Sequence, residues 1–260
     1  MALAFDTYGA GPPLVLLHGT GGQRGMWDPV VGILARERRV IALDLPGFAA
    51  SADEDFDATP SGYTSWLERW FAEQGLGRPH VAGNSMGGGI ALELARRGAV
   101  ASATAISPVG FWTAREVAFA QQSLRAARAI VKVTRPAIPA VTRSAVGRVA
   151  LLSQIYAKPW RLSPDDAMAA VDAFVDGPAF EPALAGFADY RVRDGDELRG
   201  VPVTIAWGTR DWLLIPRQAQ RARRLLPWAR HVTLNGCGHV PCHDDPEAVA
   251  AVLLSASREG

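Results

Sequence analysis

Residues 83–88 read Gly-Asn-Ser-Met-Gly-Gly, which fits the pattern G-x-S-x-G. A short apolar run, residues 79–83, ends in this stretch, and a helical pattern, residues 88–97, follows it directly. A serine on such a strand-to-helix turn has a strained backbone, so the flanking positions must be small. The turn exposes the hydroxyl at a helix N-terminus, where free N–H groups favour developing negative charge. Ser85 is therefore the candidate nucleophile.

A serine hydroxyl becomes a good nucleophile only when a base removes its proton, and His239 is the best candidate base. It lies in a glycine-flanked loop, residues 235–241 (NGCGHVP), between an apolar run and the last helical pattern. Asp211, at the end of residues 207–211 (WGTRD), follows another apolar run and would orient the base. The order Ser85, Asp211, His239, each just past a strand, predicts a catalytic triad. The other histidines have poorer positions: His18 at a strand end, His80 and His231 at strand starts, and His243 just behind His239.

An oxyanion hole should be formed by two main-chain N–H groups. One is that of Met86, which directly follows the nucleophile. The second should come from the glycine-rich loop at residues 18–22 (HGTGG), where Thr20 is the first choice and Gly21 the alternative. His18 is expected to be a structural hydrogen-bonding residue.

Short apolar runs alternate with helical patterns along most of the chain, as in α/β proteins. The predicted strands lie at residues 13–18, 39–44, 79–83, 101–107, 201–207 and 230–234. Residues 112–195 contain no convincing strand and instead hold helical patterns at 115–133 and 164–174, broken by prolines. We predict an α/β core with a mostly parallel, doubly wound sheet, formed by residues 1–111 and 196–260. A helical cap, residues 112–195, is inserted between the two core segments.

These motifs together resemble those of the α/β-hydrolase superfamily, over nearly the whole chain. In chain order they are His18-Gly19, residues 44–47 (DLPG), residues 83–88, residues 207–211 and Gly238-His239. The resemblance implies a mostly parallel sheet with helices on both faces and a cap after the sixth strand of the family. Only residues 2–9 precede the turn that leads to the strand at residue 14, so the first strand of the family is expected to be absent.

Within this superfamily, a serine hydrolase that cleaves a small, largely apolar carboxylic ester through an acyl-enzyme is the preferred function. Ser85 argues against haloalkane dehalogenases and epoxide hydrolases, which use aspartate at that position. The nucleophile turn and the His18-Gly19 loop also resemble carbon–carbon hydrolases of ring-cleavage pathways, but those carry tryptophan where this chain has Val240. Acyltransferase, lyase or cyclase chemistry with the same triad remains open. A non-catalytic ligand-binding member is less favoured, because no triad residue is lost.

Aromatic side chains of the predicted cap are expected to wall an apolar acyl or aryl pocket. For each of them, packing between helices is the competing interpretation. The candidates are Trp112, Phe119, Tyr156, Trp160 and Phe174, with Phe187 as a further one.

Composition limits the partners of the protein. The 260 residues are 48% hydrophobic and 20% charged, and the net charge is +1. No global field would attract nucleic acid or an anionic membrane, so a small molecule is the expected partner. No signal peptide or membrane span is visible, which predicts a cytoplasmic protein with reduced cysteines. A monomer or homodimer is expected. No cofactor is expected. The cluster Cys237, His239, Cys242 and His243 suggests a metal site only weakly, because His239 already has a role.

Overall fold

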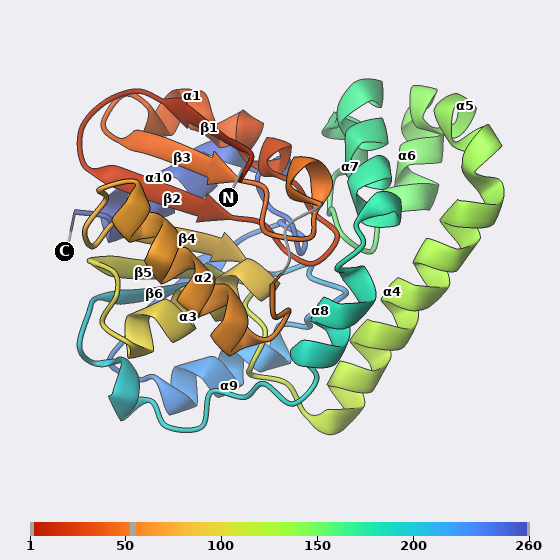
Figure 1. The fold of residues 1–260 in the computed structure, drawn as a ribbon. Coiled ribbons are helices and arrows are strands. Elements are labelled where there is room, and N and C mark those ends of the chain that lie inside the picture. Colours follow the sequence, from red (N-terminus) through yellow and green to blue (C-terminus); the bar gives the residue numbers. More distant parts are fainter. Residues whose placement is uncertain (1–2, 53–55, 259–260) are drawn as a thin grey trace.

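The computed structural model describes residues 3–52 and 56–258. Its strands form a seven-stranded sheet with the order β1-β3-β2-β4-β5-β6-β7 (Figure 1). All neighbouring strands are parallel except β1 and β3, which pair antiparallel. The mostly parallel, doubly wound fold predicted from the sequence is therefore confirmed. The strands are β1 (Phe5–Tyr8), β2 (Pro13–Leu17), β3 (Arg39–Leu43), β4 (His80–Asn84), β5 (Ser102–Ile106), β6 (Val203–Gly208) and β7 (Arg230–Leu234).

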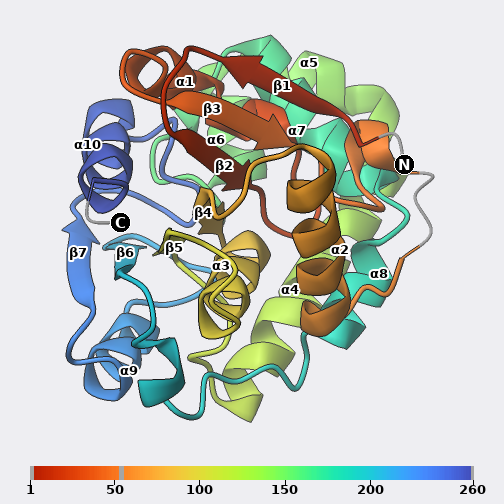
Figure 2. The same cartoon turned by 60° about the vertical axis from the view of Figure 1, so that its left-hand side comes forward.

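Helices cover both faces of the sheet, and the strand residues alternate between two apolar cores. Leu14 and Leu16 of β2 pack with α1 (Asp28–Leu34) and α10 (Pro246–Ala256) on one face. Val15 and Leu17 point to the other face, into the core shared by α2 (Pro60–Glu73), α3 (Met86–Arg96) and α9 (Arg217–Leu225). Figure 2 shows α1 and α10 on one side of the sheet and α2, α3 and α9 on the other. Strands buried on both faces explain the continuous apolar runs.

The segment between β5 and β6 is helical, and we call residues 112–195 the insertion. Figure 1 shows its helices beside the end of the sheet at which the parallel strands finish. Ligands of open α/β sheets bind outside these carboxyl ends. The helices are α4 (Ala114–Thr134), α5 (Ile138–Arg143), α6 (Ala145–Leu152), α7 (Pro164–Asp176) and α8 (Phe180–Gly186).

The N-terminal stretch, for which the sequence predicted no strand, carries one. The four residues of β1 pair with β3, from Phe5 opposite Leu43 to Tyr8 opposite Val40. Phe5 and Tyr8 remain more than one-third exposed, because β1 is an edge strand. A short, exposed edge strand lacks the buried apolar run that marks the other strands in the sequence.

Across the two described stretches, no helix combines the length and apolarity that crossing a bilayer requires.

Candidate active site

Ser85 lies between the end of β4 and the start of α3, in a strained conformation with φ +57° and ψ −113°. Two glycines allow this turn. A Cβ atom on Gly83 would lie 2.1 Å from the carbonyl oxygen of Gly87, and one on Gly87 would lie 2.4 Å from the carbonyl oxygen of Leu17. Both contacts are far closer than atoms can approach. The G-x-S-x-G spacing is therefore a steric requirement of this turn.

We expect the Gly87→Ala variant to lose at least about 2 kcal/mol of unfolding free energy, because its methyl group would overlap main-chain atoms that cannot move independently. Gly32→Ala is the matched control. Gly32 lies in α1 with open space around it, so alanine should stabilise that helix by about 0.5–1 kcal/mol. Urea unfolding of both variants measures the effect. Equal stabilities would contradict the steric explanation.

His239 and Asp211 form a buried hydrogen-bonded pair. The Nδ1–H of His239 donates to Oδ2 of Asp211 at 2.8 Å, and the two residues are 3% and 2% exposed. The other carboxylate oxygen, Oδ1, accepts the main-chain N–H groups of Leu213 and Leu214 at 3.0 and 2.8 Å. Asp211 is thus fixed by its own loop and holds the imidazole. The Nε2 atom of His239 is left to accept a proton.

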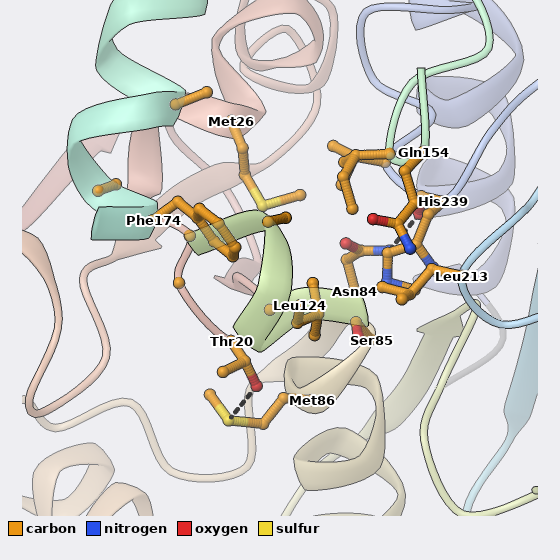
Figure 3. Close-up of a pocket in the computed structure, with 18 of the residues that line it drawn as sticks. Thr20, Met26, Asn84, Ser85, Met86, Leu124, Gln154, Phe174, Leu213 and His239 are labelled. Carbon is orange, nitrogen blue, oxygen red and sulfur yellow. Dashed lines mark hydrogen bonds between the residues drawn. The ribbon is translucent and has the colours of Figure 1, made fainter. Parts of the chain in front are cut away.

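Ser85 and His239 both line one cavity of about 330 Å³. In the view of Figure 3, the Ser85 hydroxyl lies between His239 and the pair formed by Thr20 and Met86. Among the described residues, no hydrogen bond joins the Ser85 hydroxyl to His239. Such contacts are often loose in the absence of substrate and tighten in the complex. Of the three residues predicted as a triad, Ser85 and His239 therefore line one cavity, and Asp211 is bonded directly to His239.

The predicted oxyanion residues lie beside the nucleophile. Thr20, Gly21 and Met86 all line the cavity, and the Thr20 hydroxyl donates to the sulfur of Met86 at 3.3 Å (Figure 3). A Cβ atom on Gly19 would lie only 3.0 Å from Cβ of Ser85, so this loop passes close to the nucleophile. Met86 is the first residue of α3, where main-chain N–H groups are not used within the helix.

His18 has the structural role that we expected. It is fully buried, its Nδ1–H donates to the carbonyl oxygen of Gly19 at 2.7 Å, and its Nε2 accepts the Leu45 N–H at 2.9 Å. Burial lowers the pKa of His18, which favours the neutral ring that these two bonds need. His18 therefore shapes the loop that carries Thr20.

The aromatic side chains predicted for the pocket divide into two groups. Trp112, Tyr156, Phe174 and Phe187 line the cavity. Phe119 and Trp160 do not line it and are 53% and 49% exposed, so their prediction was wrong. The cavity face of α4 carries Ala120, Leu124, Ala127 and Val131, and Phe119 lies on the outward face with Ile130. Trp160 sits in a short 3-10 helix, of which only Pro159 is buried.

Two polar side chains that the sequence analysis overlooked lie at the site. The Asn84 amide donates to the carbonyl oxygen of His239 at 2.8 Å and to that of Ile106 at 3.2 Å, which ties the histidine loop to the sheet. Gln154 lines the cavity and appears near His239 in Figure 3. Asn84 could have been found from its place inside the G-x-S-x-G motif. The position of Gln154, in the turn that follows α6, gives no comparable signal.

The cysteine and histidine cluster has no geometry for a metal. Within residues 3–52 and 56–258, no group of three or more His, Cys, Asp or Glu side chains could hold an ion. Burial, followed by the charge of Asp244, raises the pKa of the Cys237 thiol to about 11. The same causes raise the pKa of Cys242 well above its usual range. In the protein without a metal ion, both thiols are therefore protonated near neutral pH.

The class of the protein is defined by two features together. One is the mostly parallel sheet, and the other is the arrangement of Ser85, His239 and Asp211 at its carboxyl edge. The sequence profile described as "Alpha/beta hydrolase family" matches residues 14–252. The chain therefore belongs to the alpha/beta hydrolase family, as the resemblance of its motifs implied.

Individual relatives agree with this assignment. An uncharacterized protein of Mycobacterium tuberculosis is 28% identical over 256 residues, which span 94% of this chain and 74% of that protein. A pimeloyl-[acyl-carrier protein] methyl ester esterase of Nitrosomonas europaea is 37% identical over 94 residues, covering 36% of this chain and 35% of that enzyme. The solved structure of a thermophilic esterase from Thermogutta terrifontis superposes with a TM-score of 0.77 at 24% identity, over 98% of this chain and 93% of that one.

Proposed function

We propose that the protein is a serine hydrolase that cleaves small, largely uncharged and apolar carboxylic esters through an acyl-enzyme. The observation that carries the proposal is the bond from His239 to Asp211 at the cavity that Ser85 also lines. The match to a methyl ester esterase over part of the chain supports ester chemistry.

In the proposed reaction, the Ser85 hydroxyl oxygen attacks the ester carbonyl while Nε2 of His239 takes its proton. The main-chain N–H groups of Met86 and Thr20, or Gly21 in place of Thr20, stabilise the oxyanion. The histidine then gives its proton to the departing alcohol, and the acyl group stays on Ser85. A water molecule, deprotonated by His239, attacks the acyl-enzyme and releases the acid. Asp211 stabilises the imidazolium in both halves.

The cavity wall indicates the kind of ester. The insertion contributes mainly alanine, leucine and valine side chains, together with Phe174 and Phe187. Such a wall binds an acyl chain by removing apolar surface from water, worth about 25 cal/mol per Å². Asp28 and Asp166 also line the cavity but are exposed, so they mark its mouth. The negative charges of these two carboxylates disfavour the binding of anionic esters at the mouth.

We further propose that the insertion acts as a cap that limits the length of the acyl chain that the cavity can accept. Ala127 lies on the cavity face of α4, one helical turn beyond Leu124. We expect Ala127→Phe to shorten the preferred acyl chain, lowering kcat/KM for long esters by about 10-fold or more and leaving the acetyl ester nearly unchanged. The measurement is hydrolysis of p-nitrophenyl esters from acetate to dodecanoate.

Ala126→Phe is the matched control, because Ala126 is the preceding residue of the same helix and is exposed. It adds the same side chain outside the cavity, so the profile of activity against chain length should remain that of the wild type. Identical profiles of activity against chain length for both variants would show that the insertion does not limit the acyl chain.

A further inference from the structure

Asp244 is a fully buried carboxylate in the loop that follows His239, and the proposed reaction does not use it. Its Oδ2 atom accepts the N–H of Gly238 at 2.7 Å and that of Ala157 at 3.0 Å, and its Oδ1 accepts the N–H of Lys158 at 2.7 Å. Gly238 directly precedes the base, whereas Ala157 and Lys158 belong to the insertion. One carboxylate therefore joins two segments that are about eighty residues apart in the sequence.

The same two segments are joined by main-chain bonds on the other side of Gly238. The carbonyl oxygen of Ile155 accepts the N–H groups of His239 and Val240 at 2.8 and 3.0 Å. The fit is close, because a Cβ atom on Gly238 would lie 2.6 Å from the Ala157 nitrogen. The backbone on both sides of the imidazole is thus held by residues 155–158.

Two cationic side chains of the insertion strengthen this junction between residues 155–158 and the loop that carries His239. Lys158 Nζ and Arg161 Nη1 donate to the main-chain carbonyl of Asp244 at 2.9 and 2.7 Å. Hydrogen bonds in which the donor or the acceptor is ionised are roughly twice as strong as those between neutral groups. Removing a buried acceptor leaves its donors without partners, which costs more than the bond itself contributes.

We infer that Asp244 is a positioning residue that sets the location of His239 by fastening its loop to residues 155–158 of the insertion. The inference rests on the proposed function, in which His239 is the base. Residues 155–158 then form part of the framework of the active site and do not open with a lid. A shift of this segment carries the imidazole with it, and displacements of about 1 Å in a catalytic site can cost about 100-fold in rate.

The test compares Asp244→Asn and Asp244→Ala with Asp245→Asn. Asparagine at 244 keeps the shape but turns an NH₂ group toward at least one of the three N–H donors. Asp245 caps α10 by accepting the Ala248 N–H at 3.1 Å, and asparagine is an equally good helix cap. The control therefore makes the same chemical change one residue away, without touching the junction.

We expect kcat for a p-nitrophenyl ester to fall about 10- to 100-fold in the Asp244 variants, more for alanine than for asparagine, with KM little changed. Asp245→Asn should match the wild type. Should alanine prevent folding, Asp244→Asn alone still decides the result. If Asp244 only stabilised the fold, its variants would have a lower melting temperature and a smaller active fraction. The hydrogen bond from His239 to Asp211 would then be unchanged in the molecules that are folded.

Nuclear magnetic resonance of protein labelled with ¹⁵N-histidine detects the hydrogen bond from His239 to Asp211 without any substrate. The chain has only five histidines, and His239→Gln identifies the ring in question. We expect the Nδ1–H signal of His239 to shift or broaden in Asp244→Asn and to stay unchanged in Asp245→Asn. Folded Asp244 variants with an unchanged signal and unchanged kcat would overturn the inference. Because the signal needs no turnover, it separates this outcome from an absence of ester hydrolysis, which would refute the proposed function instead.

Discussion

The Ser85→Ala variant should lose ester hydrolysis by about 10⁴- to 10⁶-fold, the range in which removing the nucleophile of a serine hydrolase falls. Ser85 is 9% exposed and lines the cavity, and its hydroxyl is the proposed point of covalent attachment. Alanine cannot form that bond. The fold should survive, because the variant removes one oxygen and keeps the Cβ atom. Steady-state hydrolysis of p-nitrophenyl butyrate measures the loss, and circular dichroism verifies the fold.

Ser107→Ala is the matched control for this result. Ser107 follows β5, the strand next to β4, is fully buried and also has a positive φ, +43°. Its hydroxyl has no hydrogen-bond partner among the described residues. Its removal should leave the rate within about twofold of the wild type, as for changes that touch no reacting group. Full activity in a folded Ser85→Ala protein would eliminate Ser85 as the nucleophile.

The second large effect is expected for Asp211→Asn, with a fall in kcat of about 10⁴-fold. The amide oxygen can keep the two N–H donors from Leu213 and Leu214, which directs the NH₂ group at His239. Two donors cannot bond to each other, so Nδ1 of His239 must lose its proton and accept instead. The proton then sits on Nε2, where it blocks removal of the Ser85 proton.

The ¹⁵N-histidine spectrum tests this explanation independently of the rate. The wild type should show the Nδ1–H tautomer of His239 and Asp211→Asn the Nε2–H tautomer. A strong loss of rate with an unchanged tautomer would show that Asp211 acts in another way. An unchanged rate would contradict its role in the site.

Much of the molecule could be predicted from sequence, because its strongest constraints are local. Strands buried on both faces produce uninterrupted apolar runs, so the predicted strands from residue 13 onward match β2 to β7 to within one or two residues. The turn around Ser85 requires glycine at 83 and 87, and steric requirements of this kind leave a clear motif. The family assignment followed from the same motifs and is confirmed.

The parts that sequence did not predict depend on tertiary packing. Phe119 and Ala120 are neighbours in the chain, yet they lie on different faces of α4, and only the packing of that helix decides which faces the cavity. Asp244 and Asp245 both precede a helix, where acidic residues normally indicate a cap, so nothing in the sequence distinguishes Asp244. Its real partners come from the insertion, and no local pattern indicates them. The strand β1 was missed because an edge strand lacks a continuous apolar run.

The most direct test of the account is to locate the covalent bond that Ser85 is proposed to form. p-Nitrophenyl diethyl phosphate transfers its diethylphosphoryl group to an activated serine, releases p-nitrophenolate and leaves a stable adduct. Mass spectrometry of the treated protein should show one such group, on the peptide that contains Ser85, together with complete loss of ester hydrolysis. The Ser85→Ala protein should remain unlabelled. Ester hydrolysis that persists without label, or a label on another residue that accompanies inactivation, would contradict the account.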